Sequence, residues 1–440
     1  MAIKSTLGLE IEFMLVNKNG QIVNNADKII EKSKKKAPKA FIIPEIAENM
    51  LEIGSDPSEK VSVSSQSLLD NINLSVKAAS EEKTLLLPTA TYPGEFIPKM
   101  RDKGLYKIKK KLFAEKFDIT GKCVGFHLHH ALPQGSFDAT SKNLKAVLSK
   151  KTKKSLVEAY NLSIALDPVL TTFMQSSPFY DGKHLGKDSR MIVYRGGKIL
   201  NYEKGLYSEH LQEFGELPPY KFNESDLLDM VVERYSVWKK IIRQLSPESV
   251  DTVNYGSMLA TAWNPVKINP HGTIELRGMD MNFPSLLFCI SVAVKHLFQD
   301  VYEHSLQVVP SDIGVAEYFK EEKGKLFVPP DEYVRKKLQY LSAYVGMESD
   351  FVRSYCKSFL KLAKTLVPNS SKKFLRPFEE MVETEHTVSD KILHQAIKLG
   401  YKQGEQLPDE IAQKLALTNA SQFLDDLEKT QDLIEKHKNV

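Results

Sequence analysis

Apolar and polar positions alternate with a period of two in four separated segments, which is the pattern of half-buried β-strands. In the first, Leu7–Val16, Leu9 and Ile11 point to one side while Glu10 and Glu12 point to the other. Two carboxylates on one strand face repel each other, so the arrangement calls for a positive charge between them, from Lys, Arg or a divalent cation. A strand with a solvated acidic face is the alternative interpretation.

The other three segments repeat this construction, with charged or imidazole side chains opposite apolar ones. They are Phe41–Ile53 with Glu48 and Glu52, Gly121–His130 with His127 and His129, and His271–Asp280 with Glu275 and Arg277. Glu48 and Glu52 share a face in a helix or in a strand, because a spacing of four suits both periods. Together the four segments predict one sheet with a polar concave face that holds a ligand. Taken singly, they also fit surface carboxylates, hydrogen-bonded histidines and an Arg277 that only neutralises Glu275.

Spacings of three and four between apolar residues predict helices between these strands and through the C-terminal part. The expected elements include helices over Ser65–Lys83, Gly104–Lys116, Leu156–Thr172, Leu227–Leu245, Glu332–Tyr344 and Glu348–Val367, and a further strand over Thr84–Leu87. A shift in composition near residue 310 divides the chain into a main domain, 1–310, and a helical region, 311–440. We expect that region to pack on the apolar back of the sheet and to contribute stability.

Composition and charge narrow the classes of partner. Of the 440 residues, 42% are hydrophobic and 26% charged, which is ordinary for a protein with a buried core. Lys and Arg together number 60 and Asp and Glu 56, a net charge of +4, which gives no general field for nucleic acid. Basic residues cluster at Lys32–Lys39, Lys107–Lys111 and Lys150–Lys154. Such runs usually form solvated faces, and binding of anionic ligands is the alternative.

Cysteine usage and hydropathy favour the cytoplasm. The three cysteines are far apart and odd in number, so no disulfide framework is expected. The N-terminus enters a strand pattern without a secretory leader. The longest apolar stretch, Phe283–Phe298, is too short to span a bilayer, so no membrane partner is expected. The oligomeric state stays open, a homo-oligomer included.

The types of side chain in the four segments select the metal. Many carboxylates with one or two histidines and no cysteine favour Mg²⁺, or Mn²⁺, over structural zinc. Mg²⁺ next to arginine suits a nucleoside triphosphate, since the cation neutralises phosphate oxygens and a guanidinium holds a carboxylate or the moving phosphoryl group. The chain contains neither a GxxxxGK[ST] loop nor a convincing GxGxxG.

Four motifs, in the same order, resemble those of the carboxylate–amine ligases related to glutamate–cysteine ligase and, more remotely, to glutamine synthetase. They are Gly8-Leu-Glu-Ile-Glu-Phe13, Gly125-Phe-His-Leu-His129, Ser177-Pro-Phe-Tyr-Asp-Gly182, and His271-Gly-Thr-Ile-Glu-Leu-Arg277 with Asp280. The likeness covers about residues 5 to 290 and is most specific in the last motif. Tyr180 stands where the family usually has Trp, and the stretch around Arg190 aligns only to within a residue.

The resemblance implies an α+β fold: a curved, mainly antiparallel sheet forming a cup, with helices on its outer face, as in glutamine synthetase. It also implies ATP as co-substrate and Mg²⁺ as cofactor. By transfer of motif positions, the metal ligands would be Glu10, Glu12, Glu52, His127 and Glu275, with Glu48 a further candidate. Arg277 and Arg190 would hold the amino-acid carboxylate or the transferring phosphoryl group, and His129 would contact substrate.

The implied reaction is phosphorylation of the side-chain carboxylate of glutamate, followed by attack of an amine on the acyl phosphate. Cysteine is the expected amine, which gives γ-glutamylcysteine, a glutathione precursor. Three other functions stay open. They are ligation of another amine, phosphoryl transfer to an acceptor such as a guanidino compound, and nucleotide or metal binding without catalysis.

Overall fold

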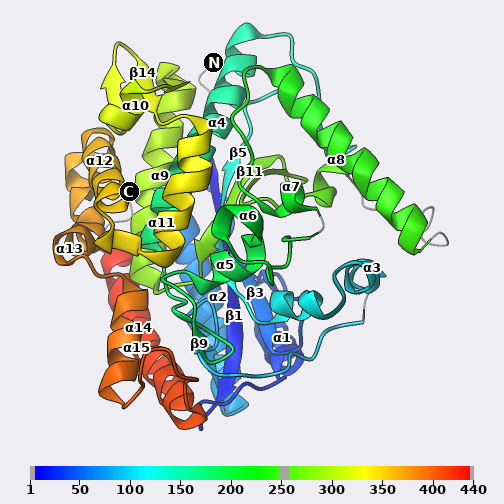
Figure 1. The fold of residues 1–440 in the computed structure, drawn as a ribbon, viewed down its shortest axis with the longest axis vertical. Coiled ribbons are helices and arrows are strands. Elements are labelled where there is room, and N and C mark those ends of the chain that lie inside the picture. The colour runs from blue at the N-terminus through cyan, green and yellow to red at the C-terminus, as the bar shows by residue number, and fades with distance from the viewer. Residues whose placement is uncertain (1–4, 103, 210, 247–256, 437–440) are drawn as a thin grey trace.

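A seven-stranded antiparallel sheet runs through the centre of the molecule (Figure 1). The structure is a computed structural model that describes residues 5–102, 104–209, 211–246 and 257–436. The strands of the sheet are β1 (Leu7–Asn17), β2 (Ile42–Pro44), β3 (Met50–Gly54), β4 (Thr84–Leu87), β5 (Gly125–Ala131), β10 (Val266–Asn269) and β11 (Thr273–Asp280). Their order is β10-β11-β5-β1-β3-β2, and β4 also pairs with β1. The four polar segments of the sequence therefore do lie in one sheet, on β1, β3, β5 and β11.

Alternation along the strands separates an apolar face from a polar one. On β1, Leu9, Ile11 and Phe13 are almost fully buried in the core. On β5, His130 points away from the polar face and stacks on Phe298, with ring centroids 3.9 Å apart. One continuous hydrophobic cluster extends from β1 to the C-terminal helices. The fold class predicted from the sequence, an antiparallel sheet with helices on its outer face, is confirmed.

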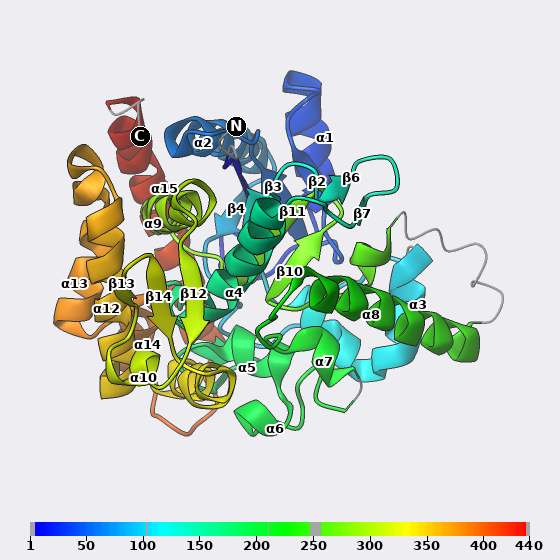
Figure 2. The same cartoon turned by 90° about the horizontal axis from the view of Figure 1, so that it is seen from above.

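Long helices cover the apolar face. They are α2 (Val61–Glu81), α4 (Lys150–Phe173), α9 (Pro284–His304) and α15 (Asp409–Glu435), with α1 (Ala26–Lys36) packed beside α2. Figure 2 shows α9 and α15 side by side over this layer. The C-terminal α15 contacts α2, β4 and α9, and its Phe423 lies edge-on against Phe13 of β1, 5.3 Å between ring centroids.

Mostly short elements and one long helix surround the opposite, polar side of the sheet (Figures 1 and 2). They are α3 (Gly104–Phe113), a 3₁₀ segment (Ala114–Gly121), the strand pairs β6 (Phe137–Asp138) with β7 (Asn143–Leu144) and β8 (Phe179–Tyr180) with β9 (Lys183–His184), α5 (Ser189–Arg195), α6 (Gly197–Leu200), α7 (Gln212–Gly215), α8 (Glu224–Leu245) and a second 3₁₀ segment (Met258–Thr261). After α8 the chain is described again from Ser257 onward.

Two helices begin earlier than their apolar spacing indicates, because polar caps set their first turns. Ser149 accepts a hydrogen bond from the backbone N–H of Thr152 and starts α4. Asn223 and Asp226 form a reciprocal capping box at the start of α8. The predicted strand over Thr84–Leu87 is confirmed with the same bounds.

A small sheet that the hydrophobic pattern did not predict joins the end of the predicted main domain to the C-terminal region. Its strands are β12 (Gln307–Pro310), β13 (Lys320–Glu322) and β14 (Lys325–Val328). The rest is α10 (Ile313–Ala316), a π-helical turn (Tyr333–Leu338), α11 (Gln339–Tyr344), a 3₁₀ turn (Gly346–Glu348), α12 (Asp350–Leu366), a further 3₁₀ segment (Asn369–Leu375), α13 (Arg376–Thr384) and α14 (Val388–Lys398). The division at residues 310 and 311, which stays a prediction, falls directly after β12.

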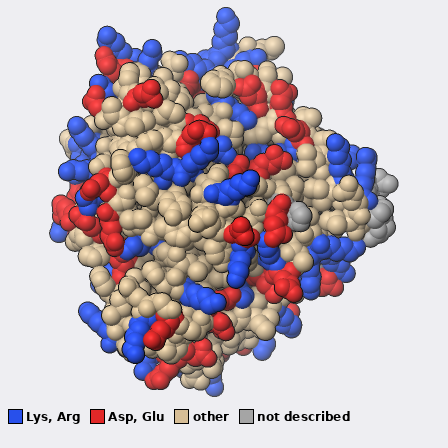
Figure 3. All heavy atoms as spheres, viewed as in Figure 1, with Lys and Arg blue, Asp and Glu red and all other residues tan. Residues whose placement is uncertain are grey.

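The surface agrees with the nearly balanced charge of the chain. Basic and acidic side chains are interspersed over the face drawn in Figure 3. Within the described ranges, the structure contains no helix that combines the length and the apolar character needed to cross a membrane.

The contact between α15 and the back of the sheet predicts a stability effect. Phe423→Ala should destabilise the protein by about 3–5 kcal/mol, because it removes a fully buried ring and leaves a cavity against Phe13. Leu424→Ala, at a neighbouring position that is 39% exposed, is the control and should stay within about 0.5 kcal/mol. Denaturant unfolding measures both. Equal effects would show that α15 does not contribute to the core.

Candidate metal and anion site

Strand register brings the predicted ligands to one face of the sheet. Glu10 of β1 lies opposite His127 of β5, and Glu12 lies opposite Glu52 of β3. On the other side of β5, His129 lies opposite Glu275 of β11. Carboxylate and imidazole groups from four strands thus form adjacent cross-strand pairs.

The first group consists of Glu10, His129 and Glu275, whose potential ligand atoms all lie within 4.8 Å of one another. His129 Nε2 is 3.0 Å from Glu10 Oε2, and its Nδ1 is 2.9 Å from the hydroxyl of Thr273. The Thr273 contact orients the ring, as an outer partner of a metal ligand does. Glu275 is almost fully buried and accepts a hydrogen bond of 2.6 Å from Asn269.

The second group consists of Glu12, Glu45 and Glu52, again within 4.8 Å. Glu12 is held in place by the backbone N–H of Gly125, 2.7 Å from its Oε2. Three carboxylates and no cation of the chain in the group make a donor set of hard oxygens, which suits Mg²⁺ or Mn²⁺.

His127 lies between the two groups. Its Nδ1 is 3.7 Å from both Glu10 Oε2 and Glu275 Oε1, and its Nε2 is 3.8 Å from Glu12 Oε1. Nε2 is buried and has no hydrogen-bond partner among the described residues. A buried nitrogen without a partner is costly unless a ligand satisfies it, so this atom fits a metal-binding role.

The two groups differ in their electrostatics. Burial opposes ionisation of Glu10, but its contacts with the imidazoles of His127 and His129 hold its pKa below the usual range. Burial also opposes ionisation of Glu275, and the charges of Arg277 and Lys267 lower its pKa. The first group is therefore ionised and largely balanced by cations of the chain itself.

In the second group the negative charges are not compensated in this way, and the pKa values of two carboxyls are raised. Burial and then repulsion by Glu45 and Glu10 raise the pKa of Glu52 well above its usual value. Burial and then the charge of Glu12 raise the pKa of Glu45. A divalent cation would relieve this repulsion, so these residues fit the implied metal.

The structure does not bring every predicted residue into the site. Glu48 lies on the turn before β3, where its carboxylate pairs with Lys99 at 2.8 Å, outside both groups. Its place is taken by Glu45, which directly follows β2 and which strand periodicity does not select. His129, assigned from the sequence to substrate, lies with Glu10 and Glu275 as a potential ligand.

Arg277 and Arg190 meet at an irregularity of β11. The register of β11 against β5 shifts between Leu276 and Met279, and bulges of this kind often occur beside active sites. Arg190 donates to the backbone carbonyls of Arg277, Gly278 and Met279 at 3.1–3.4 Å. Arg190 therefore shapes the bulge that carries Arg277.

Arg277 extends from the bulge toward the site. Its Nη1 is 3.3 Å from Glu275 Oε1. Burial disfavours its charge, but the carboxylates of Glu275 and Glu12 raise its pKa above the usual value, so it stays a cation.

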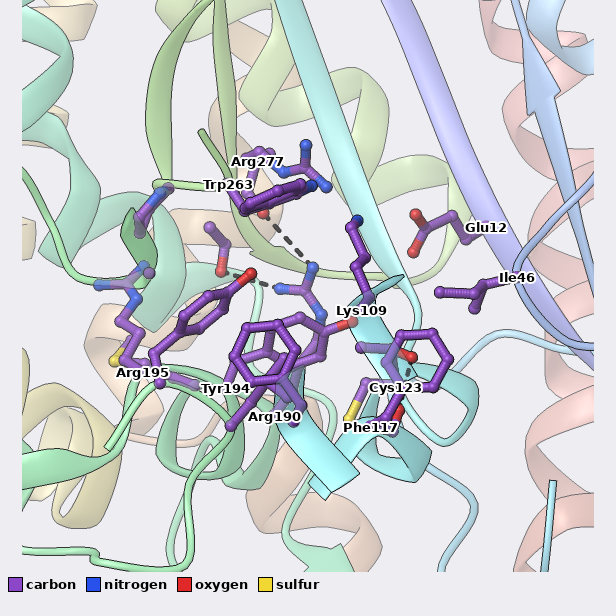
Figure 4. A pocket seen from close by; sticks show the side chains of 18 of the residues that line it. Glu12, Ile46, Lys109, Phe117, Cys123, Arg190, Tyr194, Arg195, Trp263 and Arg277 are labelled. Atoms are coloured by element: carbon purple, nitrogen blue, oxygen red, sulfur yellow. Dashed lines mark hydrogen bonds between the residues drawn. The ribbon is translucent and has the colours of Figure 1, made fainter. Parts of the chain in front are cut away.

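These residues border a cavity of about 210 Å³ (Figure 4). At one end Glu12 and Glu45 line it, and Arg190 and Arg277 line it on the other side. Segments outside the sheet complete the wall: α3, the 3₁₀ segment that follows it, α5, α7 and the loop before β10. The cavity therefore joins the second carboxylate group to a basic wall.

Sequence reasoning missed several residues of this cavity, among them Arg195, Lys109 and Trp263. Arg195 forms two hydrogen bonds, 2.6 and 2.9 Å long, with the carboxylate of Asp167 on α4. Gly278 lets the Asp167–Arg195 pair pack directly against β11, because a Cβ at this position would lie 2.4–2.5 Å from the two side chains. The only sequence signal for Lys109 was the run Lys107–Lys111.

Comparisons with known proteins agree with this architecture. A family model described as glutamate-cysteine ligase family 2 matches residues 6–318. No curated protein matches the sequence. A glutamate–cysteine ligase from Francisella tularensis, solved in complex with AMP, is similar with a TM-score of 0.55 and 14% identity, covering 99% of this chain and 93% of that one.

A bifunctional glutathione synthetase from Pasteurella multocida is similar with a TM-score of 0.51 and 13% identity. That match covers 96% of this chain and 53% of the other, so the chain spans about half the length of that protein. At these identities the two structures show a shared fold.

The second carboxylate group predicts a specific metal-binding defect. Glu52→Gln should weaken Mn²⁺ binding by more than the roughly tenfold loss typical of a supporting residue, since the amide lacks the charge that holds a hard cation. Titration calorimetry or electron paramagnetic resonance with Mn²⁺ alone measures this without reference to activity. Glu48→Gln, which removes a charge paired with Lys99 outside the group, is the matched control. Equal affinities of the two variants would contradict the assignment.

Proposed function

Because the chain belongs to glutamate-cysteine ligase family 2, we propose that it is an ATP-dependent carboxylate–amine ligase that joins the side-chain carboxylate of glutamate to the amine of cysteine. The observation that carries this proposal is the cavity with carboxylates at one end and cations at the other. Its acidic end suits metal ions that accompany a triphosphate, and its basic end suits the anionic carboxylate that must approach it. Cysteine as the acceptor rests on the family.

The proposed residue roles follow from position. Glu10, His129 and Glu275 would hold one divalent cation and Glu12, Glu45 and Glu52 another, with His127 between them. Bound Mg²⁺ would supply neutralisation of the phosphate oxygens of ATP. Arg277 would stabilise the transferring phosphoryl group or the substrate carboxylate, and Arg190 would keep its backbone in place.

The reaction has two steps. A carboxylate oxygen of glutamate attacks the γ-phosphorus of ATP, the bond to the β-phosphate oxygen breaks, and ADP leaves. The amine nitrogen then attacks the acyl carbon, phosphate leaves, and the nitrogen loses a proton to give the amide. Both steps place negative charge next to the guanidinium of Arg277, which is where a fixed cation lowers the barrier.

The wall of the cavity supports chemistry on the substrate itself. Cys123 lines the cavity, but burial raises the pKa of its thiol well above the usual value. A protonated thiol is a poor nucleophile. This favours an acyl phosphate over a covalent enzyme intermediate. The three cysteines are free and buried, which also supports the cytoplasm as the place of action.

Capture of the acyl phosphate tests the proposed reaction. With Mg²⁺, ATP, glutamate and hydroxylamine, the protein should form the γ-hydroxamate and release ADP and phosphate in equal amounts, because hydroxylamine replaces the natural amine. Omission of glutamate should reduce ADP formation to background. ADP formed together with a stable phosphorylated product, without free phosphate, would instead establish a kinase. If no combination of carboxylate and amine stimulates ADP formation, the remaining function is nucleotide or metal binding without catalysis.

The role of Arg277 predicts a large effect of a conservative change. Arg277→Lys should lower kcat by about 10²–10³, since an ammonium cannot reproduce the paired N–H donors of a guanidinium beside developing charge. Steady-state kinetics with glutamate and cysteine measure it. Arg376→Lys, on the exposed side of α13, is the control and should keep wild-type turnover. If Arg277→Lys also does so, Arg277 acts only as the partner of Glu275.

A further inference from the structure

Helix α3 turns a single lysine of its basic run toward the cavity. Tyr106, Lys109 and Phe113, spaced by three and four residues, share the face that lines it. Lys107 and Lys110 point outward and are exposed. Most lysines of the run Lys107–Lys111 therefore face solvent, whereas Lys109 lines the cavity.

The surroundings of Lys109 would favour an anion. Its Nζ lies 4.0 Å from the centroid of the Trp263 ring, a cation–π contact. In Figure 4 its side chain extends between Trp263 and Arg277 on one side and Glu12 on the other. No carboxylate of the described residues forms an ion pair or hydrogen bond with the ammonium. Burial and then the charges of Arg277 and Lys267 lower the pKa of Lys109 to about 7.

Two arginines that line the cavity have ion-pair partners in the chain. Arg195 is neutralised by Asp167. Arg277 and Lys267 share one carboxylate, that of Glu275, at 3.3 and 3.9 Å. Glu12 also lies close enough to raise the pKa of Arg277, so carboxylates of the chain compensate this cation.

Two further basic side chains line the cavity. Arg190 donates to backbone carbonyl oxygens, and its charge also acts on the buried carboxyl of Asp280. Lys109 differs from these arginines: it contacts the face of Trp263 and, among the described residues, has no carboxylate within ion-pair distance. An ammonium in a cavity without an ion pair is costly unless an opposite charge joins it, so Lys109 fits the binding of an anionic ligand.

Helix α3 is held in position independently of Lys109. Phe113 packs edge-on against Tyr207, with ring centroids 5.3 Å apart. Lys111 Nζ is 3.1 Å from the hydroxyl of Ser246, just after α8. The fold therefore does not need the Lys109 ammonium to keep the helix over the cavity, and a neutral side chain there should leave the structure intact.

We propose that Lys109, supported by the ring of Trp263, binds an anionic oxygen of the ligand in this cavity, a phosphoryl oxygen of ATP. This rests on the proposed function and extends the binding machinery from the sheet to α3. A carboxylate oxygen of the amino acid has the same chemistry and is the other source of such an oxygen. The phosphoryl group is favoured because Lys109 lies between Arg277 and Glu12, and Glu12 borders the end where the metal-bound phosphates would lie.

Direct binding tests the assignment. The probes are a non-hydrolysable ATP analogue with Mg²⁺, and glutamate, each titrated by calorimetry into wild type, Lys109→Met and Lys110→Met. Lys109→Met should bind the ATP analogue about 10- to 100-fold more weakly, which is the range for loss of a hydrogen bond to a charged group. Lys110→Met, from the outward face of the same helix, should match wild type. Lys109→Arg should restore part of the affinity, whereas a purely structural role would not depend on charge.

The outcomes separate this inference from the reaction. Weaker binding of glutamate alone in Lys109→Met supports the anion site and identifies the carboxylate as its source. Equal binding of both probes by Lys109→Met and Lys110→Met, with equal thermal midpoints, overturns it. If wild type forms no hydroxamate and Lys109→Met still loses affinity for the analogue, the proposed reaction fails and the anion site stands. Absence of binding to wild type overturns both.

Discussion

The structure depends on crowding of like charge on one face of one sheet. Antiparallel register places carboxylates of β1, β3 and β11 next to one another, and the chain after β2 adds Glu45. Such a cluster is stable only with compensating positive charge. At the first group the chain supplies it through histidines, Arg277 and Lys267, whereas at the second group burial and repulsion raise the pKa values of Glu45 and Glu52. This difference in charge compensation favours binding of a cation at the second group, Glu12, Glu45 and Glu52.

The same alternation that creates the polar face creates the support for it. Every second residue of β1 and β5 enters the apolar core, where α2, α9 and α15 bury it. His130 shows how strict the separation is: it follows His129 directly, yet it stacks on Phe298 in the core, where burial holds its pKa well below the usual value. A shift of one residue in register would exchange the two faces, so the core fixes the site geometry.

The sequence was informative where function follows a strand period. Glu10, Glu12, His127 and Glu275 were found because a period of two places them on one face. Glu45, which lies beside Glu12 and Glu52, was not selected, because the segment turns between β2 and β3 and a turn has no period. Lys109 lies on α3 and Trp263 on the loop before β10, and only the tertiary structure brings these two segments together. The small sheet of β12, β13 and β14 was missed because strands of three or four residues are too short to show alternation.

The boundary between chemistry and support is less sharp than the sequence suggests. Among described residues, none beyond 310 lines the cavity, in agreement with a supporting role for the C-terminal region. Yet Gln339 of α11 accepts a hydrogen bond from Arg195, the guanidinium that Asp167 holds beside the bulge at Gly278. Because Arg195 lines the cavity, movement of α11 would change the position of a charge in its wall. The helices behind the sheet therefore act on the site through orientation, and the cavity depends on both parts of the chain.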